Sequence, residues 1–287
     1  MSNVVYGVSS GPAHAPYYLV MLRSLRRYYD GRIHIFAYPE SYDVLSKIGA
    51  DPKIQATVEK YEPIYKGKNG QFVNKIHCAT KFAQKVDRAL YLDADTLICD
   101  SVDPLFRECG DGEMLATQFN HWTCQQRSVQ RRIARLVGID EIPQTAIRMC
   151  LKSDQPSVNG GVFCADPACP ALSNWYSWTM AAKHVFIADE TVLHVLAYYF
   201  PAVVNVAKGG IWNASPKHKS DKHLKDADVK IWHFHGDCNV RPDKSRKGLD
   251  LWWPEFRDCY DRNLGNVRTW ARDVGNSYLN ALMDKGM

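Results

Sequence analysis

Short apolar segments alternate with longer helical patterns through the first third of the chain, and this alternation restricts the possible folds more than any other feature. The expected elements are a strand at 3–9, a helix at 17–29, a strand at 32–38, a helix at 41–49, a strand at 54–61, a helix at 71–86 and a strand at 88–92. Such alternation is typical of an α/β domain with a largely parallel sheet. The last of these strands is continuously apolar, as strands at the buried centre of a parallel sheet are.

The pattern is looser in the rest of the chain, and residues up to 156 in the middle are poorly patterned. The further expected elements are a strand at 113–118, a basic helix at 125–137, a strand at 158–163, helices at 168–182 and 189–199, a strand at 229–233 and aromatic-rich helices from 252. No internal repeat or linker divides the chain. We therefore expect one α/β domain over residues 1–245, followed by a C-terminal helical extension over residues 246–287.

Composition and charge narrow the class of protein. The chain has 287 residues, 46% of them hydrophobic, which is enough to bury a real core and excludes a disordered chain. Lysine and arginine number 36 against 31 acidic residues, a net charge of +5. So small an excess does not indicate a nucleic-acid partner, whereas an anionic small molecule fits it.

The cysteines and the apolar segments suggest a location. Nine cysteines are scattered along the chain, and the first residues lack the pattern of a signal peptide, so we expect reduced thiols and a cytoplasmic protein. The longest apolar stretch, 192–207, contains His194, Pro201 and Asn205 and is shorter than the roughly 20 residues that span a bilayer. We therefore expect no transmembrane segment.

Two carboxylates, Asp93 and Asp95, directly follow the apolar strand at 88–92. Open α/β sheets bind ligands beyond the carboxyl ends of their strands, so this position favours a site. Paired carboxylates hold Mg²⁺ or Mn²⁺ while substrate phosphates supply the other oxygens. The alternative is an ordinary loop, where aspartate caps helices and forms turns.

Two later segments combine residues that also have simpler explanations. Asn159, Gly160 and Gly161 precede an apolar run, where adjacent glycines let a ligand approach the backbone, or simply form a turn. Asp189 and Glu190 open an expected helix, where capping and the helix dipole alone account for many such pairs.

A zinc site is a further alternative near the last strand. His233, His235 and Cys238 could supply three ligands. The sequence offers no second ligand pair at the usual spacing, so a structural zinc is disfavoured.

Several segments, taken in order, resemble the nucleotide-sugar glycosyltransferases of the GT-A fold, and above all glycosyltransferase family 8, the glycogenin and lipopolysaccharide galactosyltransferase group. The similar segments are 75–78 (KIHC), 89–98 (ALYLDADTLI), 102–106 (VDPLF), 158–163 (VNGGVF), 188–193 (ADETVL) and 231–236 (IWHFHG). The resemblance spans about residues 3–245. It implies a GT-A, Rossmann-like fold for nucleotide-diphospho-sugar transfer.

The resemblance also implies a ligand set and a donor site. Mn²⁺, or Mg²⁺, would be held by Asp93, Asp95 and His233. The donor-contacting positions implied are Val8, Ser9, Ser10, His14 and Tyr17 for the base and ribose, Lys75, Ala94, Asn159, Gly160 and Gly161 for the sugar and phosphates, and Gly236, Arg241 and Lys244 near the diphosphate. The lysine that follows the glycine by three positions in the family is Asn239 here, so Arg241 or Lys244 would replace it.

The pair Asp189–Glu190 departs from the family, in which the second residue is usually glutamine. Other retaining transferases of this fold carry Asp-Glu there, with the glutamate beside the anomeric carbon. A carboxylate at that place could stabilise an oxocarbenium-like transition state or attack it. The resemblance thus implies that Asp189 and Glu190 are catalytic and that the sugar's anomeric configuration is retained.

Four arginines, at 127, 131, 132 and 135, are spaced so that they gather on or beside one helix face. They form either a solvated basic face or an electropositive wall near the acceptor. The second interpretation would suit a phosphorylated or lipid-linked acceptor, or a peripheral contact with an anionic membrane.

Taken together, the sequence predicts a metal-dependent glycosyltransferase that moves a hexose from a UDP-sugar to a hydroxyl of a glycan, a lipid-linked or a protein acceptor. Two alternatives stay open. A nucleotidyltransferase of related fold would need a Gly- and Arg-rich loop after the first strand, which residues 9–12 (SSGP) lack. A non-catalytic module that binds sugar nucleotides or glycans would not need Asp93, Asp95, Glu190 and His233 together.

Overall fold

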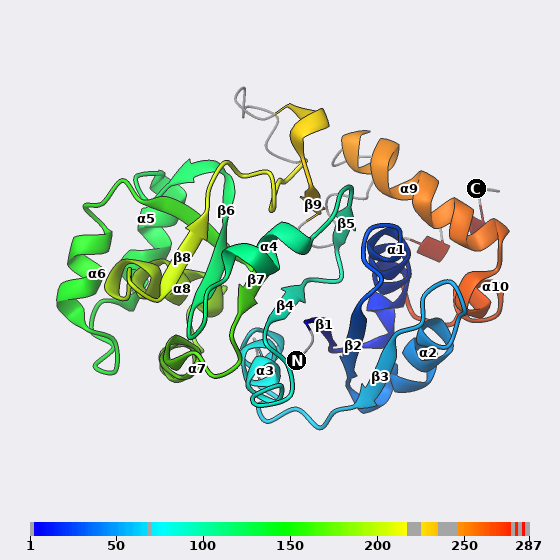
Figure 1. Cartoon of the computed structure of the whole chain (residues 1–287), viewed down its shortest axis with the longest axis horizontal. Helices are drawn as coiled ribbons and strands as arrows, with labels where there is room; N and C mark the ends of the chain where they lie inside the picture. Colours follow the sequence, from blue (N-terminus) through cyan, green and yellow to red (C-terminus); the bar gives the residue numbers. More distant parts are fainter. Residues whose placement is uncertain are drawn as a thin grey trace.

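A mixed seven-stranded sheet forms the centre of the molecule (Figure 1). The structure is a computed structural model that describes residues 3–67, 70–216, 225–234, 246–276, 279–280 and 283–284, without the side chains of Gln71 and residues 246–249. In spatial order the strands are β3 (Thr57–Lys60), β2 (Arg32–Ala37), β1 (Val4–Ser9), β4 (Ala89–Leu92), β7 (Pro156–Ala165), β6 (Met114–Thr123) and β8 (Val204–Ala207).

Only β7 runs against the other strands of this sheet. It pairs antiparallel with both β4 and β6, whereas all other neighbours pair parallel. In the register of β4 with β7, Leu92 lies opposite Val162. The residues before Val162 therefore extend past the carboxyl end of β4, toward the edge where ligands bind in open α/β sheets.

Helices cover both faces of the sheet because its strands alternate apolar side chains between the two faces. Val5 and Leu90 join a core with α1 (Ala15–Arg26) and α2 (Pro39–Gly49). Tyr6 and Tyr91 join a second core with the helices of the other face. These helices are α3 (Gly70–Thr80), α5 (Arg127–Ile133), α6 (Gln144–Cys150), α7 (Pro170–Ala181) and α8 (Ala188–Tyr199).

A small second sheet lies beyond the carboxyl end of β4. It pairs β5 (Thr96–Ile98) antiparallel with β9 (Ile231–His233), so that Thr96 lies opposite His233. Helix α4 (Asp103–Glu108) follows β5. This pairing brings the last described strand back to the loop that carries Asp93 and Asp95.

The C-terminal helices pack on the first helix of the chain. Helix α9 (Arg246–Asp261) lies along α1 (Figure 1). The tilted rings of Trp252 and Tyr17 have their centroids 5.4 Å apart, and Glu255 pairs with Arg27 at 2.6 Å. The chain then passes through α10 (Val267–Trp270). The division of the chain at residue 245 stays a prediction, and Trp252 belongs to the same apolar core as the residues of α1.

The expected α/β class and largely parallel sheet are confirmed, and the differences are local. The helix expected at 71–86 ends at Thr80, and the strand expected at 113–118 continues to Thr123. Four elements were missed: β5, β8 and α4, which have only a few residues each, and α6. The region that seemed unpatterned before residue 156 contains α6.

Two further observations bear on the environment of the chain. All the described cysteines, which exclude only Cys238, are free thiols. Among the described residues, no helix is both long and apolar enough to cross a bilayer.

Candidate functional site

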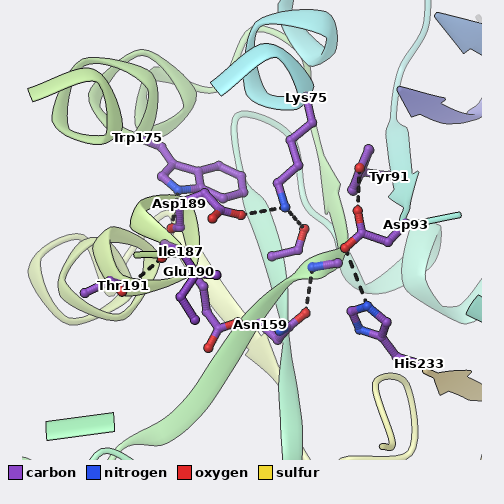
Figure 2. A network of polar contacts seen from close by, with 12 residues as sticks. Lys75, Tyr91, Asp93, Asn159, Trp175, Ile187, Asp189, Glu190, Thr191 and His233 are labelled. Atoms are coloured by element: carbon purple, nitrogen blue, oxygen red, sulfur yellow. Dashed lines mark hydrogen bonds and ion pairs between the residues drawn. The ribbon is translucent and has the colours of Figure 1, made fainter. Parts of the chain in front are cut away.

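The loop after β4 holds Asp93 and Asp95 in a tight turn. The backbone N–H of Asp93 donates to the carbonyl of Gly161 on β7 at 2.8 Å. Thr96 closes the turn, because its backbone N–H and its hydroxyl both donate to the carbonyl of Asp93, at 3.2 and 2.8 Å. The hydroxyl of Tyr91 donates to Oδ1 of Asp93 at 2.5 Å, which leaves Oδ2 directed to the open side of the turn (Figure 2).

His233 meets these carboxylates from the second sheet. Its Nε2 lies 3.2 Å from Oδ1 of Asp95 and 3.5 Å from Oδ2 of Asp93. One ligand atom of each residue lies within 4.8 Å of the others. Two carboxylates and an imidazole at this separation form a candidate site for one divalent cation.

Asn213 fixes the orientation of the His233 ring. Its Oδ1 lies 2.9 Å from Nδ1 of His233, so Nε2 is the ring nitrogen that faces the two carboxylates. The amide of Asn213 in turn donates to the Thr117 hydroxyl at 2.9 Å. A histidine ligand commonly has such a partner on its other nitrogen, and the partner tunes the metal site.

Asn213 belongs to none of the motifs of the sequence analysis and opens only a formal glycosylation sequon, Asn213-Ala214-Ser215. It is fully buried, so it is not a glycosylation site in the folded protein. Its position beside His233 depends on an isolated bridge between Ala214 and Trp232, a contact that no local pattern reveals.

Gly161 leaves space beside two of the ligand groups, those of Asp93 and His233. A Cβ at this position would lie 2.6 Å from Oδ2 of Asp93 and would overlap the ring of His233. The donor set, the ring orientation and this cradle together fit a hard or borderline cation such as Mg²⁺ or Mn²⁺.

A buried ion pair lies next to this cluster. Lys75 of α3 is 3% exposed, and its Nζ lies 2.6 Å from Oδ2 of Asp189 and donates to the carbonyl of Gly160 at 2.8 Å (Figure 2). Burial alone would lower the pKa of Lys75, but the carboxylates of Asp189 and Asp93 outweigh it and raise that pKa. Lys75 is therefore a fixed positive charge in the floor of the site.

Glu190 has both carboxylate oxygens engaged. Oε1 pairs with Arg132 of α5, and Oε2 accepts from the side-chain amide of Asn159 at 2.5 Å. Burial raises the pKa of Glu190, and the charge of Arg132 opposes this rise. The carboxylate is thus held in one orientation between α5 and β7.

A strained residue, Ile187, precedes helix α8, whose first turn carries Asp189 and Glu190. Ile187 has a left-handed backbone with φ of +47°, and its carbonyl accepts from both the backbone and the hydroxyl of Thr191. The indole of Trp175 donates to the carbonyl of Asp189 at 2.8 Å. A β-branched residue in this conformation is costly, and such strain is often found at functional sites.

His194, one turn along α8, anchors the helix to β7. Its Nδ1 lies 2.6 Å from the carbonyl of Glu190, and its Nε2 accepts from the backbone N–H of Val158 at 3.3 Å and contacts the Ser157 hydroxyl at 3.0 Å. Burial and the nearby charge of Arg132 lower the pKa of His194 to about 3, so the ring is neutral.

These groups line a cleft with two connected parts, which share Phe72, Lys75, Asp93 and Asp95. The larger part has a volume of about 590 Å³. Its remaining lining residues are Phe119, Trp122, Ser128, Arg132, Asn159, Gly160, Gly161, Phe186, Ile187, Asp189, Glu190 and His233. The smaller part, about 180 Å³, is further lined by Val8, Ser10, His14, Tyr17, Tyr91 and Ala94.

The structure thus brings together most of the residues that the sequence singled out. Ser9 is an exception, because its buried hydroxyl donates to the carbonyl of Gly11 and does not line the cleft. Gly236, Arg241 and Lys244 lie outside the described residues. The same holds for His235 and Cys238 of the zinc alternative.

The basic helix does not form one wall of arginines. Arg127, Arg131 and Arg135 are exposed, and Arg135 lies beyond the end of α5 in a 3₁₀ turn. Of the four, only Arg132 lines the cleft. Three of the four arginines therefore form the solvated face that was the alternative interpretation.

Comparison with solved structures identifies the fold. The galactosyltransferase LgtC, solved in complex with donor and acceptor sugar analogues, is similar with a TM-score of 0.61 and 16% identity over 89% of this chain and 95% of that one. The bifunctional glycosyltransferase WbbM gives 0.61 and 13% over 91% of this chain and 52% of that one. Mouse xyloside xylosyltransferase 1 gives 0.53 and 16% over 84% and 98%.

These similarities show the GT-A glycosyltransferase fold and confirm the expected fold class. No protein-family model matches the chain, and no curated protein sequence matches it.

Proposed function

We propose that this chain is a metal-dependent glycosyltransferase that moves a hexose from a UDP-sugar to an acceptor hydroxyl, with retention of the anomeric configuration. The observation that carries the proposal is the convergence of Asp93, Asp95 and His233 beside two buried acidic residues, Asp189 and Glu190, in one cleft. The fold shared with solved glycosyltransferases supports it.

In this proposal the two parts of the cleft divide the donor between them. The smaller part, next to His14 and Tyr17, receives the nucleoside, because aromatic side chains there offer a face to the base. The diphosphate then lies over Asp93 and Asp95, which both parts share. The sugar and the acceptor occupy the larger part.

The metal-binding residues would be Asp93 and Asp95, through carboxylate oxygens, and His233, through Nε2. The bound cation supplies charge stabilisation to the departing diphosphate. Lys75 contributes a second, permanent positive charge to the same floor.

The acidic pair orients and stabilises the sugar. Oδ1 of Asp189 is buried and has no hydrogen-bond partner among the described residues, so a donor-sugar hydroxyl is its natural partner. The carboxylate of Glu190 faces the region where positive charge develops on the sugar as the bond to the diphosphate breaks. A carboxylate there supports retention, either by stabilising that charge or by attacking the anomeric carbon.

The test is a panel of UDP- and GDP-sugars screened for hydrolysis with and without Mn²⁺. We expect one UDP-hexose to be turned over only when the cation is present, and NMR of the first product to show the donor's own anomer. Tight UDP binding without turnover of any donor would replace the proposal with a non-catalytic binding module. Turnover of a nucleoside triphosphate and a sugar phosphate would replace it with a nucleotidyltransferase.

The acceptor class, the cytoplasmic location and a peripheral membrane contact stay predictions from the sequence. An acceptor screen on the same donor, comparing free glycans, lipid-linked glycans and glycoproteins, would define the class. Arg241 and Lys244 are proposed to contact the diphosphate, and their substitution would be expected to raise KM for the donor.

A further inference from the structure

Arg132 is the one residue of the basic segment at 127–135 whose charge reaches the cleft. It is 18% exposed and pairs with Oε1 of Glu190, although 58 residues separate the two along the chain. Its neighbour Arg131 is exposed to solvent. Helix α5 is anchored by Val129 and Ile133, both fully buried, so its packing does not depend on the guanidinium group.

Glu190 is clamped from two sides. Asn159 donates to Oε2, and Asn159 is itself fixed because its Oδ1 accepts from the backbone N–H of Gly161 at 2.7 Å. Arg132 occupies the other oxygen, Oε1. With both oxygens occupied, the carboxylate plane has one orientation within the cleft.

Of the two cations near Glu190, Arg132 is the one that acts as its counter-ion. Lys75 is the other cation close by, but its ion pair is with Asp189 and its hydrogen bond is to Gly160. Asp189 adds a like charge that disfavours a second carboxylate. A buried carboxylate without a cation would take up a proton, and a protonated acid offers no negative charge to the sugar.

We propose that Arg132 is a positioning residue, which holds Glu190 ionised and correctly oriented for the transfer step. This inference rests on the proposed function and deepens it. It explains how this chain can use glutamate at a place where its resemblance to family 8 would lead one to expect glutamine. A neutral glutamine would need no counter-ion, whereas a glutamate does.

The test compares Arg132→Gln and Arg132→Lys with Arg131→Gln, a control one residue away on the same helix. We expect Arg132→Gln to lower kcat for Mn²⁺-dependent donor turnover on the order of 100-fold, since one partner of a buried pair is removed. KM for the donor should stay within about threefold, because Arg132 does not line the nucleoside part of the cleft. Arg132→Lys should restore part of kcat, and Arg131→Gln should match the wild type.

A pH profile separates this role from a merely structural one. The acidic limb of kcat reports the protonation of Glu190, and removal of Arg132 should move it to higher pH, because burial is then less opposed. Among the described residues, the charged and titratable groups that act on Glu190 are Arg132 from α5, Lys75 from α3, and Asp189 and the neutral His194 from α8. The amide of Asn159 from β7 is its further hydrogen-bond partner.

The double variant with Glu190→Gln provides an internal check. Once Glu190 is neutral, Arg132→Gln should change kcat by less than about threefold further. Equal losses in both backgrounds, or an Arg132→Gln variant with the wild-type kcat and acidic limb, would overturn the inference and leave the proposed function intact. A wild-type protein without turnover of any sugar nucleotide would overturn the proposed function, and the inference with it.

Discussion

The cleft contains two acidic pairs, which we call its two ends, and the chain compensates their negative charge in different ways. One end is Asp93 and Asp95, and the other is Asp189 and Glu190. At one end, Asp93 and Asp95 lie beside the buried imidazole of His233, whose Nε2 is 3.5 Å from Asp93 and 3.2 Å from Asp95. At the other end, Asp189 and Glu190 each have a cation of the chain as partner, namely Lys75 and Arg132.

This difference shows which carboxylates are neutralised by lysine and arginine side chains of the chain itself. The end at Asp93 and Asp95 places two carboxylates close together beside an imidazole, so it gains most from an added divalent cation. The end at Glu190 is neutral overall and rigid, so its carboxylates are ready to act on a ligand. An added divalent cation should therefore affect activity through Asp93 and Asp95. It should have little effect on the stability that depends on Asp189 and Glu190.

The largest effect is expected from Asp95→Asn, which breaks the metal-binding end. Mn²⁺-dependent donor hydrolysis should fall on the order of 1000-fold, about 4 kcal/mol in the barrier, because a charged ligand is lost. The stability of the metal-free protein should change little, because relief of the repulsion from Asp93 is offset by a weaker contact with His233. Initial rates against Mn²⁺ concentration and urea unfolding measure the two effects.

The control for this variant is Asp103→Asn, at an exposed position in the first turn of α4. It should keep the wild-type rate. A normal rate in Asp95→Asn as well would show that the carboxylates of this end do not hold the cation.

At the end formed by Asp189 and Glu190, Lys75→Met is expected to lower stability, in contrast to Asp95→Asn, which lowers activity. Removal of this cation leaves Asp189 buried and uncompensated, so the free energy of unfolding should fall by about 3 kcal/mol, and added Mn²⁺ should not restore it. Urea unfolding with and without Mn²⁺ measures this.

Lys81→Met is the matched control, because Lys81 pairs with Glu59 at 3.5 Å on the surface. A surface pair of this kind contributes less than about 1 kcal/mol. If the two variants lost equal stability, the buried Lys75–Asp189 pair would not compensate charge as described for the Glu190 end.

A smaller effect is expected from Asn213→Ala, which leaves all three ligands in place. The ring of His233 loses the hydrogen-bond partner of its Nδ1, which orients the ring, so Mn²⁺ affinity should fall roughly 10- to 100-fold. Titration calorimetry with Mn²⁺ measures this. Asn205→Ala, on β8 where Asn205 donates to Glu113, should bind the cation as the wild type does, and equal affinities in all three proteins would contradict the orienting role.

The smallest effect concerns pH. His194 has a folded-state pKa of about 3, below the value of about 6.5 that an unfolded histidine has, so the unfolded chain binds the proton first as the pH falls. The stability that depends on neutral His194 is complete above about pH 6.5 and is lost below it, by about 1 kcal/mol between about pH 7 and pH 5.5.

Urea unfolding at these two pH values should show a smaller loss in His194→Gln than in the wild type. His184→Gln, at an exposed position, should show the wild-type loss. Identical pH dependence in all three proteins would show that His194 is not held neutral.

The sequence predicted the parts of the fold and site that follow from local pattern. Strong periodicity marked the strands and helices of the first third, and an apolar strand running into Asp93 and Asp95 marked the edge of the sheet. The resemblance then supplied His233, and the structure brings it to the same edge.

The partners of these residues could not be predicted in the same way. Arg132 was one of four equivalent arginines in the sequence, and only the packing of α5 against α8 distinguishes it from Arg131. Asn213 carried no helical or strand pattern, and its place depends on the bridge to β9. Residues that orient other residues act through tertiary contacts, which leave no periodic trace in the chain.

The pairing of β5 with β9 has a consequence for the order in which the molecule is made. Thr96 and His233 lie opposite each other but are 233 − 96 = 137 residues apart, so their contact closes a long loop and forms late. A chain emerging from the ribosome exposes Asp93 and Asp95 long before His233 exists to meet them. The three candidate metal ligands can therefore meet only after synthesis has passed β9.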